Sequence, residues 1–169
     1  MFDVDNFRSV FVKGLKEYLK IQIIRSNQTG EPPKYPYGSY TITTLASENK
    51  GTWGRYEDGK ERKPITLNLS FTIQSNNASE VMRLTLKAHE WFDRVGTVYL
   101  NDNNVIVQSV GNISNRDNFL TIEYECRQGF DVTCWFLNEI TDTAEETGYI
   151  EFVNINDSFI EPSLSTEEL

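Results

Sequence analysis

The chain has 169 residues and a mass of 19.5 kDa, which is the size of one domain and enough to bury a core without disulfide bonds. Its 16 Lys and Arg against 25 Asp and Glu give a formal net charge of -9, which argues against tight non-specific binding to nucleic acid. The acidity is local, because residues 139–169 contain nine Asp or Glu and no Lys or Arg, and the 138 residues before them are neutral overall.

Two further observations narrow the class of protein. The longest apolar run, residues 134–137, is far shorter than the roughly 18 residues that a membrane-spanning helix needs. The N-terminal residues lack the basic and apolar regions of a signal peptide. With only two cysteines, Cys126 and Cys134, the sequence predicts a protein that stays in a reducing cytoplasm and has no membrane partner.

The first predicted element is a helix that begins at Asp3 or Asp5, either of which can cap its first turn, and ends near Lys20. Its apolar residues recur three and four positions apart, as on the buried face of an amphipathic helix: Val4, Phe7, Phe11, Leu15 and Tyr18. The stretches 21–24 and 37–45 follow as candidate strands.

Residues 47–63 have no apolar period and contain three glycines, and we expect a long loop there. The next stretch, 65–73, alternates apolar and polar residues and is the clearest strand in the sequence. Asn77 and Glu80 resemble a capping box, which predicts a helix that runs to about Val95 and ends at Gly96. This helix has one apolar stripe and, beside it, a flank formed by Met82, Leu86 and His89, so its apolar arc is wider than one sheet face requires.

Three further strands are predicted at 105–110, 118–127 and 130–138, with a tight hairpin turn at Gln128 and Gly129. In that register Cys126 and Cys134 point to opposite faces of the sheet, and no disulfide is expected. The last strand is apolar on both faces, which is typical of a strand covered by two layers or by a partner. The order of elements predicts an α+β fold with a mostly antiparallel sheet flanked by two helices.

Candidate catalytic chemistry is sparse. His89 is the only histidine, so zinc sites with several histidines are excluded, and no local nucleophile signature surrounds either cysteine. No glycine-rich phosphate motif occurs either. We therefore expect no enzyme activity, metal or cofactor. The one alternative of this kind is an enzyme that uses Cys126 or Cys134 together with His89.

The expected loop collects five bases and two aromatics, a mixture that can bind a nucleic-acid strand: Lys50, Trp53, Arg55, Tyr56, Lys60, Arg62 and Lys63. Four acids in the same loop reduce its charge to about +1, so a loop that orders against a protein partner is favoured over a DNA-binding module.

Three stretches carry a resemblance to a known family. They are Tyr-Pro-Tyr-Gly-Ser-Tyr-Thr-Ile at 35–42, the strand and helix at 67–92, and the run 109–125 that continues into Gly-Phe-Asp-Val at 129–132. The most specific residues are Asn115, Arg116, Asp117, Gly129, Phe130 and Asp131. Together these stretches resemble the neck or tail terminator proteins of tailed bacteriophages, from about residue 35 to residue 139.

The resemblance implies a tail-terminator-like domain at 1–139. Residues 140–169 lie beyond the resemblance, and their composition and alternation predict an acidic extension that adds at most one strand before a frayed end. The resemblance implies a structural virion protein that forms a ring, commonly of six subunits, on the end of the tail tube. The ring would stop tube polymerisation and join the tail to the head connector. Its partners would be other copies of the chain, the tube protein and a head-completion or connector protein, with DNA only passing through the channel.

A ring that closes head to tail pairs one surface patch with a different one. We expect the subunit interface among the helix flank and the last strand: Met82, Leu86, His89, Trp135 and Phe136. The basic loop would face the tube or the lumen. The alternative is a head-tail connector or completion protein that binds the portal side and not the tube. The protein would act at the neck of the virion and be present in the host cytoplasm during assembly.

The acidic extension allows two interpretations. If its carboxylates face the channel of a ring, they repel passing DNA and let it slide. If it lies on the rim, its charge serves solubility or a contact with a basic neighbour.

Overall fold

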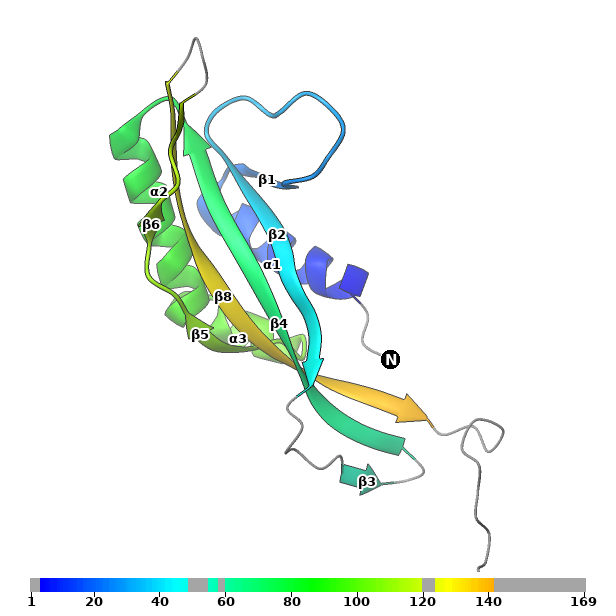
Figure 1. Ribbon diagram of the computed structural model, residues 1–169. Helices are drawn as coiled ribbons and strands as arrows, with labels where there is room; N and C mark the ends of the chain where they lie inside the picture. The colour runs from blue at the N-terminus through cyan, green and yellow to red at the C-terminus, as the bar shows by residue number, and fades with distance from the viewer. Residues whose placement is uncertain (1–3, 49–54, 58–59, 120–123, 142–169) are drawn as a thin grey trace, which may run out of the picture.

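The computed structural model describes residues 4–48, 55–57, 60–119 and 124–141. Its helices are α1 (Val4–Leu19), α2 (Ala78–Glu90) and α3 (Thr97–Asp102), with one π-helical turn (Trp91–Val95) between the last two. Its strands are β1 (Gln22–Arg25), β2 (Tyr37–Glu48), β3 (Arg55–Glu57), β4 (Lys60–Ser75), β5 (Ile106–Val110), β6 (Ser114–Asn115), β7 (Asn118–Phe119) and β8 (Tyr124–Thr141). Figure 1 shows how the two longest strands, β4 and β8, run side by side through the molecule.

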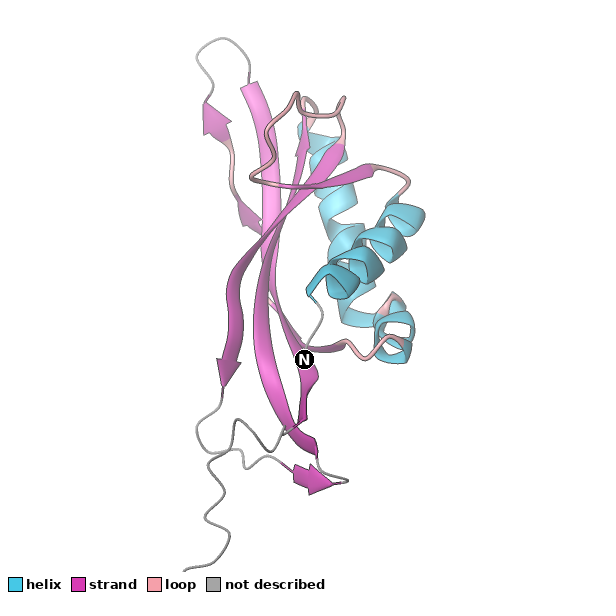
Figure 2. Cartoon of the chain, turned by 90° about the vertical axis from the view of Figure 1, so that its right-hand side faces the viewer, coloured by secondary structure: helices cyan, strands magenta, loops and turns pink. Residues whose placement is uncertain are grey.

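The sheet has the strand order β1-β2-β4-β8-β5, and β3, β6 and β7 pair with β4 or β8 outside this order. Every pairing is antiparallel except that of β1 with β2. The helices cover one face of the sheet (Figure 2). We call the other face, which no described helix covers, the open face. The predicted α+β class with a mostly antiparallel sheet is confirmed, and α3 is an additional helix that the sequence did not predict.

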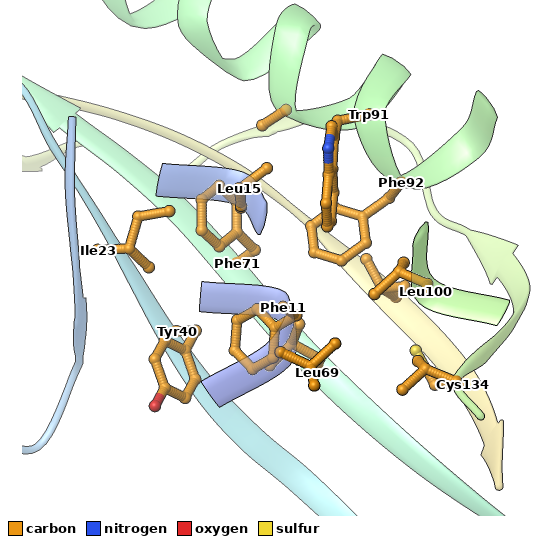
Figure 3. Close-up of a cluster of buried hydrophobic side chains, with 14 of the residues drawn as sticks. Phe11, Leu15, Ile23, Tyr40, Leu69, Phe71, Trp91, Phe92, Leu100 and Cys134 are labelled. Atoms are coloured by element: carbon orange, nitrogen blue, oxygen red, sulfur yellow. The ribbon is translucent and has the colours of Figure 1, made fainter. Parts of the chain in front are cut away.

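The core lies between the helices and the covered face of the sheet (Figure 3). The alternation predicted for β4 is observed, since Leu67, Leu69 and Phe71 are fully buried and pair with buried residues of β8. From α1, Phe11 packs edge-on against Tyr40 of β2, with ring centroids 4.8 Å apart. Large aromatic side chains provide much of the apolar area that such a core removes from water.

The predicted cap of α2 is present, but Glu80 has a different partner from the one a capping box supplies. The Asn77 side chain accepts hydrogen bonds from the backbone N–H groups of Ser79 (3.0 Å) and Glu80 (3.2 Å). Glu80 accepts from the Ser75 hydroxyl (2.6 Å), and that oxygen in turn accepts from the Asn77 N–H (3.3 Å). Ser75 therefore links the cap to the end of β4.

Gly96 does not end the helical region as predicted, because α3 follows it directly and its φ of -86° is right-handed. Its role is to make room. A Cβ at this position would lie 2.4 Å from the indole ring of Trp91, which is buried against the core. The helical path therefore runs from the π-helical turn at Trp91–Val95 through Gly96 into α3. Only a residue without a side chain fits beside the Trp91 ring at this position.

The predicted hairpin at Gln128 and Gly129 is wrong, because β8 continues through both residues and pairs with β4 along its whole length. The register places Gly129 opposite Thr72. Cys126 and Cys134 are consequently on the same face of one strand, not on opposite faces as predicted. They are eight residues apart, about 26 Å at 3.3 Å per residue, which is beyond the reach of a disulfide, and both are free.

The predicted loop at 47–63 is also partly wrong. β2 extends to Glu48, β3 spans 55–57, and β4 begins at Lys60. Lys60, Arg62 and Lys63 therefore lie in a strand whose partner is the end of β8. No apolar period marks this part of β4, but Arg62 lies directly opposite Glu139 of β8. A cross-strand pair of opposite charges stabilises strand pairing without a buried face.

Candidate interaction surfaces

The flank of α2 is exposed, as its residues predicted. Met82 is 53% and Leu86 is 62% exposed, whereas Val81, Leu84 and Ala88 on the core side of the same helix are buried. His89 is half-buried. Its ring lies edge-on to Phe130, with centroids 5.1 Å apart, and its Nε2 is 3.2 Å from the carbonyl oxygen of Gly111. We call Met82, Leu86 and His89 the helix flank.

A second apolar surface lies on the open face of the sheet. Trp135 of β8 is 36% exposed and pairs with Ile106 of the edge strand β5, which is 52% exposed. Leu137, two residues further along β8, is 56% exposed and pairs with Pro64. We call Ile106, Trp135 and Leu137 the sheet strip. The helix flank belongs to the helix layer and the sheet strip to the opposite, open face, so the sheet lies between them (Figure 2).

Phe136 does not belong to either surface. Its side chain points to the covered face, is buried, and packs edge-on against Phe7 of α1 with ring centroids 4.8 Å apart. The prediction that Phe136 is an interface residue is therefore corrected, because alternation along β8 turns Trp135 outward and Phe136 inward.

The family-motif residues form a clamp on the open face, at the other end of the sheet. The Arg116 guanidinium donates from Nη1 to Ser70 Oγ (2.8 Å) and Thr72 Oγ1 (2.9 Å) of β4, and from Nη2 to Asp131 Oδ1 (2.9 Å) of β8. Ser70 also donates to Asp131 Oδ1 (2.7 Å). The hydrogen bonds from Ser70 and Arg116 hold the pKa of Asp131 below its usual value. One side chain thus ties two strands together.

Asn115, Asp117 and Gly129 hold Arg116 in this position. Asn115 donates to Asp117 Oδ2 (2.9 Å) and accepts from the Asp117 N–H (2.7 Å), which closes a tight turn before β7. Asp117 in turn accepts the backbone N–H of Arg127 (2.6 Å). A Cβ on Gly129 would lie 2.9 Å from Arg116 Nη1 and 2.3 Å from the Phe71 carbonyl oxygen. Gly129 therefore leaves room for Arg116 to cross β8.

Phe130, the remaining motif residue, is fully buried and contacts Phe71 and Phe92. The motif residues are thus explained by packing and by strand cross-linking. Their spacing predicted a family, and the structure assigns them a structural role.

Comparison with known families provides a match over most of the chain. The profile described as phage neck terminator protein matches residues 9–162, from the first half of α1 to beyond the end of β8.

The chain belongs to the phage neck terminator family.

Membership indicates a structural protein of the phage tail, located at the neck of the virion. Among solved structures, one chain aligns with this neck terminator at 13% sequence identity and a TM-score of 0.44. The alignment covers 84% of this chain and 100% of the other. A comparison with curated proteins finds no match. In the part of the neck terminator that the structure describes, no helix is long and apolar enough to cross a membrane.

A charged arm extends from the sheet of the neck terminator, beyond Leu137, and is formed by residues 60–63 of β4, residues 138–141 of β8, and β3 (Figure 1). Glu139 accepts a hydrogen bond from Arg62 Nε (2.7 Å) and lies 3.8 Å from Lys60 Nζ. Arg62 and Lys60 hold the pKa of Glu139 below its usual value, mainly through the Arg62 hydrogen bond. The arm is a paired strand structure in which acids offset bases, not a loop of unpaired cations.

The residues that sequence analysis grouped as one basic loop are therefore divided. Arg55 and Tyr56 lie in β3, opposite Arg62 and Glu61 of β4. Lys60, Arg62 and Lys63 lie in β4. Lys50 and Trp53 fall outside the described residues.

His89 and Cys134 have different surroundings. Cys134 is fully buried in the core, and His89 contacts Gly111 and Phe130 at the edge of α2. Burial raises the pKa of the Cys134 thiol to about 12, and burial followed by the nearby Asp117 carboxylate raises that of Cys126. A catalytic cysteine needs the opposite shift, because the thiolate is the nucleophile.

We expect neither thiol of the native neck terminator to react with iodoacetamide at pH 7.5, because both are buried with raised pKa values. Mass spectrometry after an hour should detect less than about a tenth of the labelling seen in guanidinium chloride, where exposure restores ordinary reactivity. Rapid labelling of either cysteine in the folded protein would contradict this and revive the enzyme alternative.

Proposed function

We propose that this neck terminator assembles head to tail into a closed ring on the end of the tail tube, where it stops tube polymerisation and joins the tail to the head connector. The observation that carries the proposal is the presence of two different apolar surfaces, the helix flank and the sheet strip, on opposite sides of the sheet. When the flank of one copy meets the strip of the next, each added copy again presents one free surface of each kind, until the ring closes.

Exposure of these side chains supports the proposal energetically. Met82 and Leu86 on the flank, and Ile106 and Leu137 in the strip, are each more than half exposed. Burying a fully exposed side chain of this size contributes about 1.5–3 kcal/mol, so removing the exposed half from water contributes roughly half as much. Part of that gain offsets the loss of translational and rotational freedom on association, so a repeated contact needs several of these residues together.

The number of subunits follows from the family resemblance, which implies six. In such a ring DNA passes through the central channel without a specific binding site. We assign the charged arm to the side of the ring that faces the tube or the lumen, because its paired charges leave it polar and it extends away from both apolar surfaces.

Electron microscopy of phage particles that lack this gene tests the function. A terminator predicts tails that are longer than normal and carry no head, since nothing stops tube growth. A head-tail connector or completion protein, the alternative, predicts tails of normal length that are not attached to heads. Normal virions from the deletion strain would contradict both functions.

A further inference from the structure

A pocket of about 550 Å³ lies on the open face of the sheet, between the end of β4 and the segment that joins β1 to β2. This volume is within the roughly 300–1,000 Å³ of typical ligand pockets. The pocket is at the same end as the Arg116 clamp, and neither the helix flank nor the sheet strip contributes to it. Its residues come from separate parts of the sequence.

The lining of the pocket carries a net positive charge. Three guanidinium groups, those of Arg25, Arg116 and Arg127, line it together with one carboxylate, that of Glu31. Asp131 and Glu125 are not among the lining residues, but they form ion pairs with Arg116 and Arg127 and offset their charge. Arg25 is the lining guanidinium that has no ion pair among the described residues.

Arg127 is held in place by the carboxylate of Glu125. Its Nε donates to Glu125 Oε2 (2.7 Å), and the Tyr35 hydroxyl donates to Glu125 Oε1 (2.8 Å). Burial and the hydrogen bond to Glu125 raise the pKa of Tyr35 to about 12, so this hydroxyl remains a donor at neutral pH. Since Glu125 is buried and occupies one edge of the guanidinium, the remaining N–H groups of Arg127 are left for a ligand in the pocket.

The side-chain amide of Gln74, which lines the pocket, has a hydrogen-bond partner for only one of its two polar atoms. Gln74 is 7% exposed, and its Nε2 donates to Ser39 Oγ (2.8 Å), while its Oε1 has no hydrogen-bond partner. Exchanging the amide oxygen and nitrogen would leave the other half unpaired instead. A buried polar atom without a partner costs free energy. A peptide backbone offers both a donor and an acceptor and can satisfy either arrangement.

A peptide that fits the pocket has main-chain groups for Gln74 and carboxylates for the arginines. This chain contains such a segment, because residues 142–169 include eight Asp or Glu and no Lys or Arg. The described structure ends at Thr141, opposite Lys60. Arg127, opposite Gln74, is 14 residues earlier in the same strand, about 46 Å away at 3.3 Å per residue. The last described residue before the acidic segment therefore lies at the end of the sheet remote from the pocket of its own chain.

We infer that the pocket binds the acidic segment 142–169 of a second copy of the chain. The inference rests on the proposed ring for the identity of that copy, namely the neighbouring subunit. The segment would thereby add a charged contact to the apolar one and link successive subunits.

The test uses a labelled synthetic peptide of residues 142–169 and full-length protein in the M82E/L86E background, which keeps subunits apart if the ring proposal is right. One form of the protein retains its own acidic segment, and a second form has all eight acids of that segment changed to Asn or Gln. Fluorescence anisotropy should show binding to both forms, weakened by added salt. A peptide with its eight acids amidated should not bind.

Arg25→Glu is the decisive variant, because Arg25 lies in the pocket and makes no ion pair among the described residues. We expect it to weaken peptide binding at least about tenfold through like-charge repulsion. Arg83→Glu on the exposed side of α2 is the matched control and should change binding less than about twofold. Absence of peptide binding, or equal loss in both variants, overturns the inference.

The two forms of the protein also identify which copy supplies the segment. A segment that fills its own pocket competes at an effective concentration on the order of millimolar. Equal affinity of both forms for the peptide therefore supports the neighbouring copy, whereas much weaker binding to the form with its own acids overturns it in favour of the same chain. Peptide binding is measured on separate subunits, so a failure of the ring proposal, seen by sedimentation of the wild-type protein, is distinguishable.

Discussion

Mixing two assembly-deficient variants of the neck terminator is expected to give a 1:1 dimer and nothing larger. The flank variant carries M82E and L86E, and the strip variant carries W135E and L137E. Each removes one of the two apolar surfaces and leaves the other intact. Each variant alone should sediment as a monomer, because a head-to-tail contact needs both surfaces. The mixture can form a single junction, between the intact strip of one partner and the intact flank of the other.

The stoichiometry of this mixture distinguishes the two possible symmetries. In a twofold-symmetric contact each surface meets its own kind, so one of the variants would form a dimer without the other. Analytical ultracentrifugation or native mass spectrometry of each variant and of the mixture measures the difference. A dimer of either variant alone would contradict the ring, and so would wild-type behaviour in both.

Controls for this experiment add negative charge to the protein but leave both apolar surfaces unchanged. Arg83→Glu on α2 makes the net charge more negative by two, as each double variant does, and Asn112→Glu after β5 makes it more negative by one. Both positions are exposed and lie outside the flank and the strip. Both should assemble as the wild type does. The four substituted side chains are at least about a third exposed, so the circular dichroism of both variants should match that of the wild type.

Parts of this arrangement could be predicted from the sequence where a sequence pattern has a single structural explanation. Patterns that two different structures can produce were harder to interpret. The alternation at 65–73 and the apolar stripe of α2 each reflect one requirement, the burial of a single face, and both were predicted correctly. The prediction that the last strand is apolar on both faces is also confirmed, since Trp135 is partly exposed on one face and Phe136 is buried on the other.

A glycine and a run of charged residues each have two possible structural explanations. Gly129 was interpreted as a turn residue because turns favour glycine, but the backbone is extended there and the glycine makes room for Arg116. The bases at 60–63 were interpreted as a loop because no apolar period accompanies them, although Glu139 across the sheet pairs with two of them. In both cases the deciding residue is remote in sequence.

The pocket could not be predicted from the sequence at all. Arg25, Gln74, Arg116 and Arg127 come from β1, from β4, from the segment after β6 and from β8, and no local spacing connects them. Only the strand order, which places β1, β2, β4 and β8 next to one another, brings these side chains to one end of the open face.

Replacing Gly129 is expected to lower the stability of the fold more than any exposed substitution named above. A Cβ would lie 2.3 Å from the Phe71 carbonyl oxygen, 2.8 Å from Thr72 Oγ1 and 2.9 Å from Arg116 Nη1. The first of these is a backbone atom between two long paired strands, and it has little freedom to move. Overpacking of this kind costs about 1–3 kcal/mol. Gly129→Ala should therefore lower the melting temperature by roughly 3–10 °C, measured by calorimetry or circular dichroism.

Gly129→Asn separates close approach from turn formation. Asn tolerates the left-handed backbone of a turn better than Ala does, so in a hairpin turn it would be the milder replacement. In an extended strand crossed by Arg116 its larger side chain makes it the more damaging one. Gly111→Ala is the matched control, because its Cβ would lie 3.1 Å from the Asp131 carbonyl oxygen and requires only a small shift. We expect the loss of stability to increase in the order Gly111→Ala, Gly129→Ala, Gly129→Asn. If Gly129→Asn is as stable as the wild type, the clamp does not cross β8 as described.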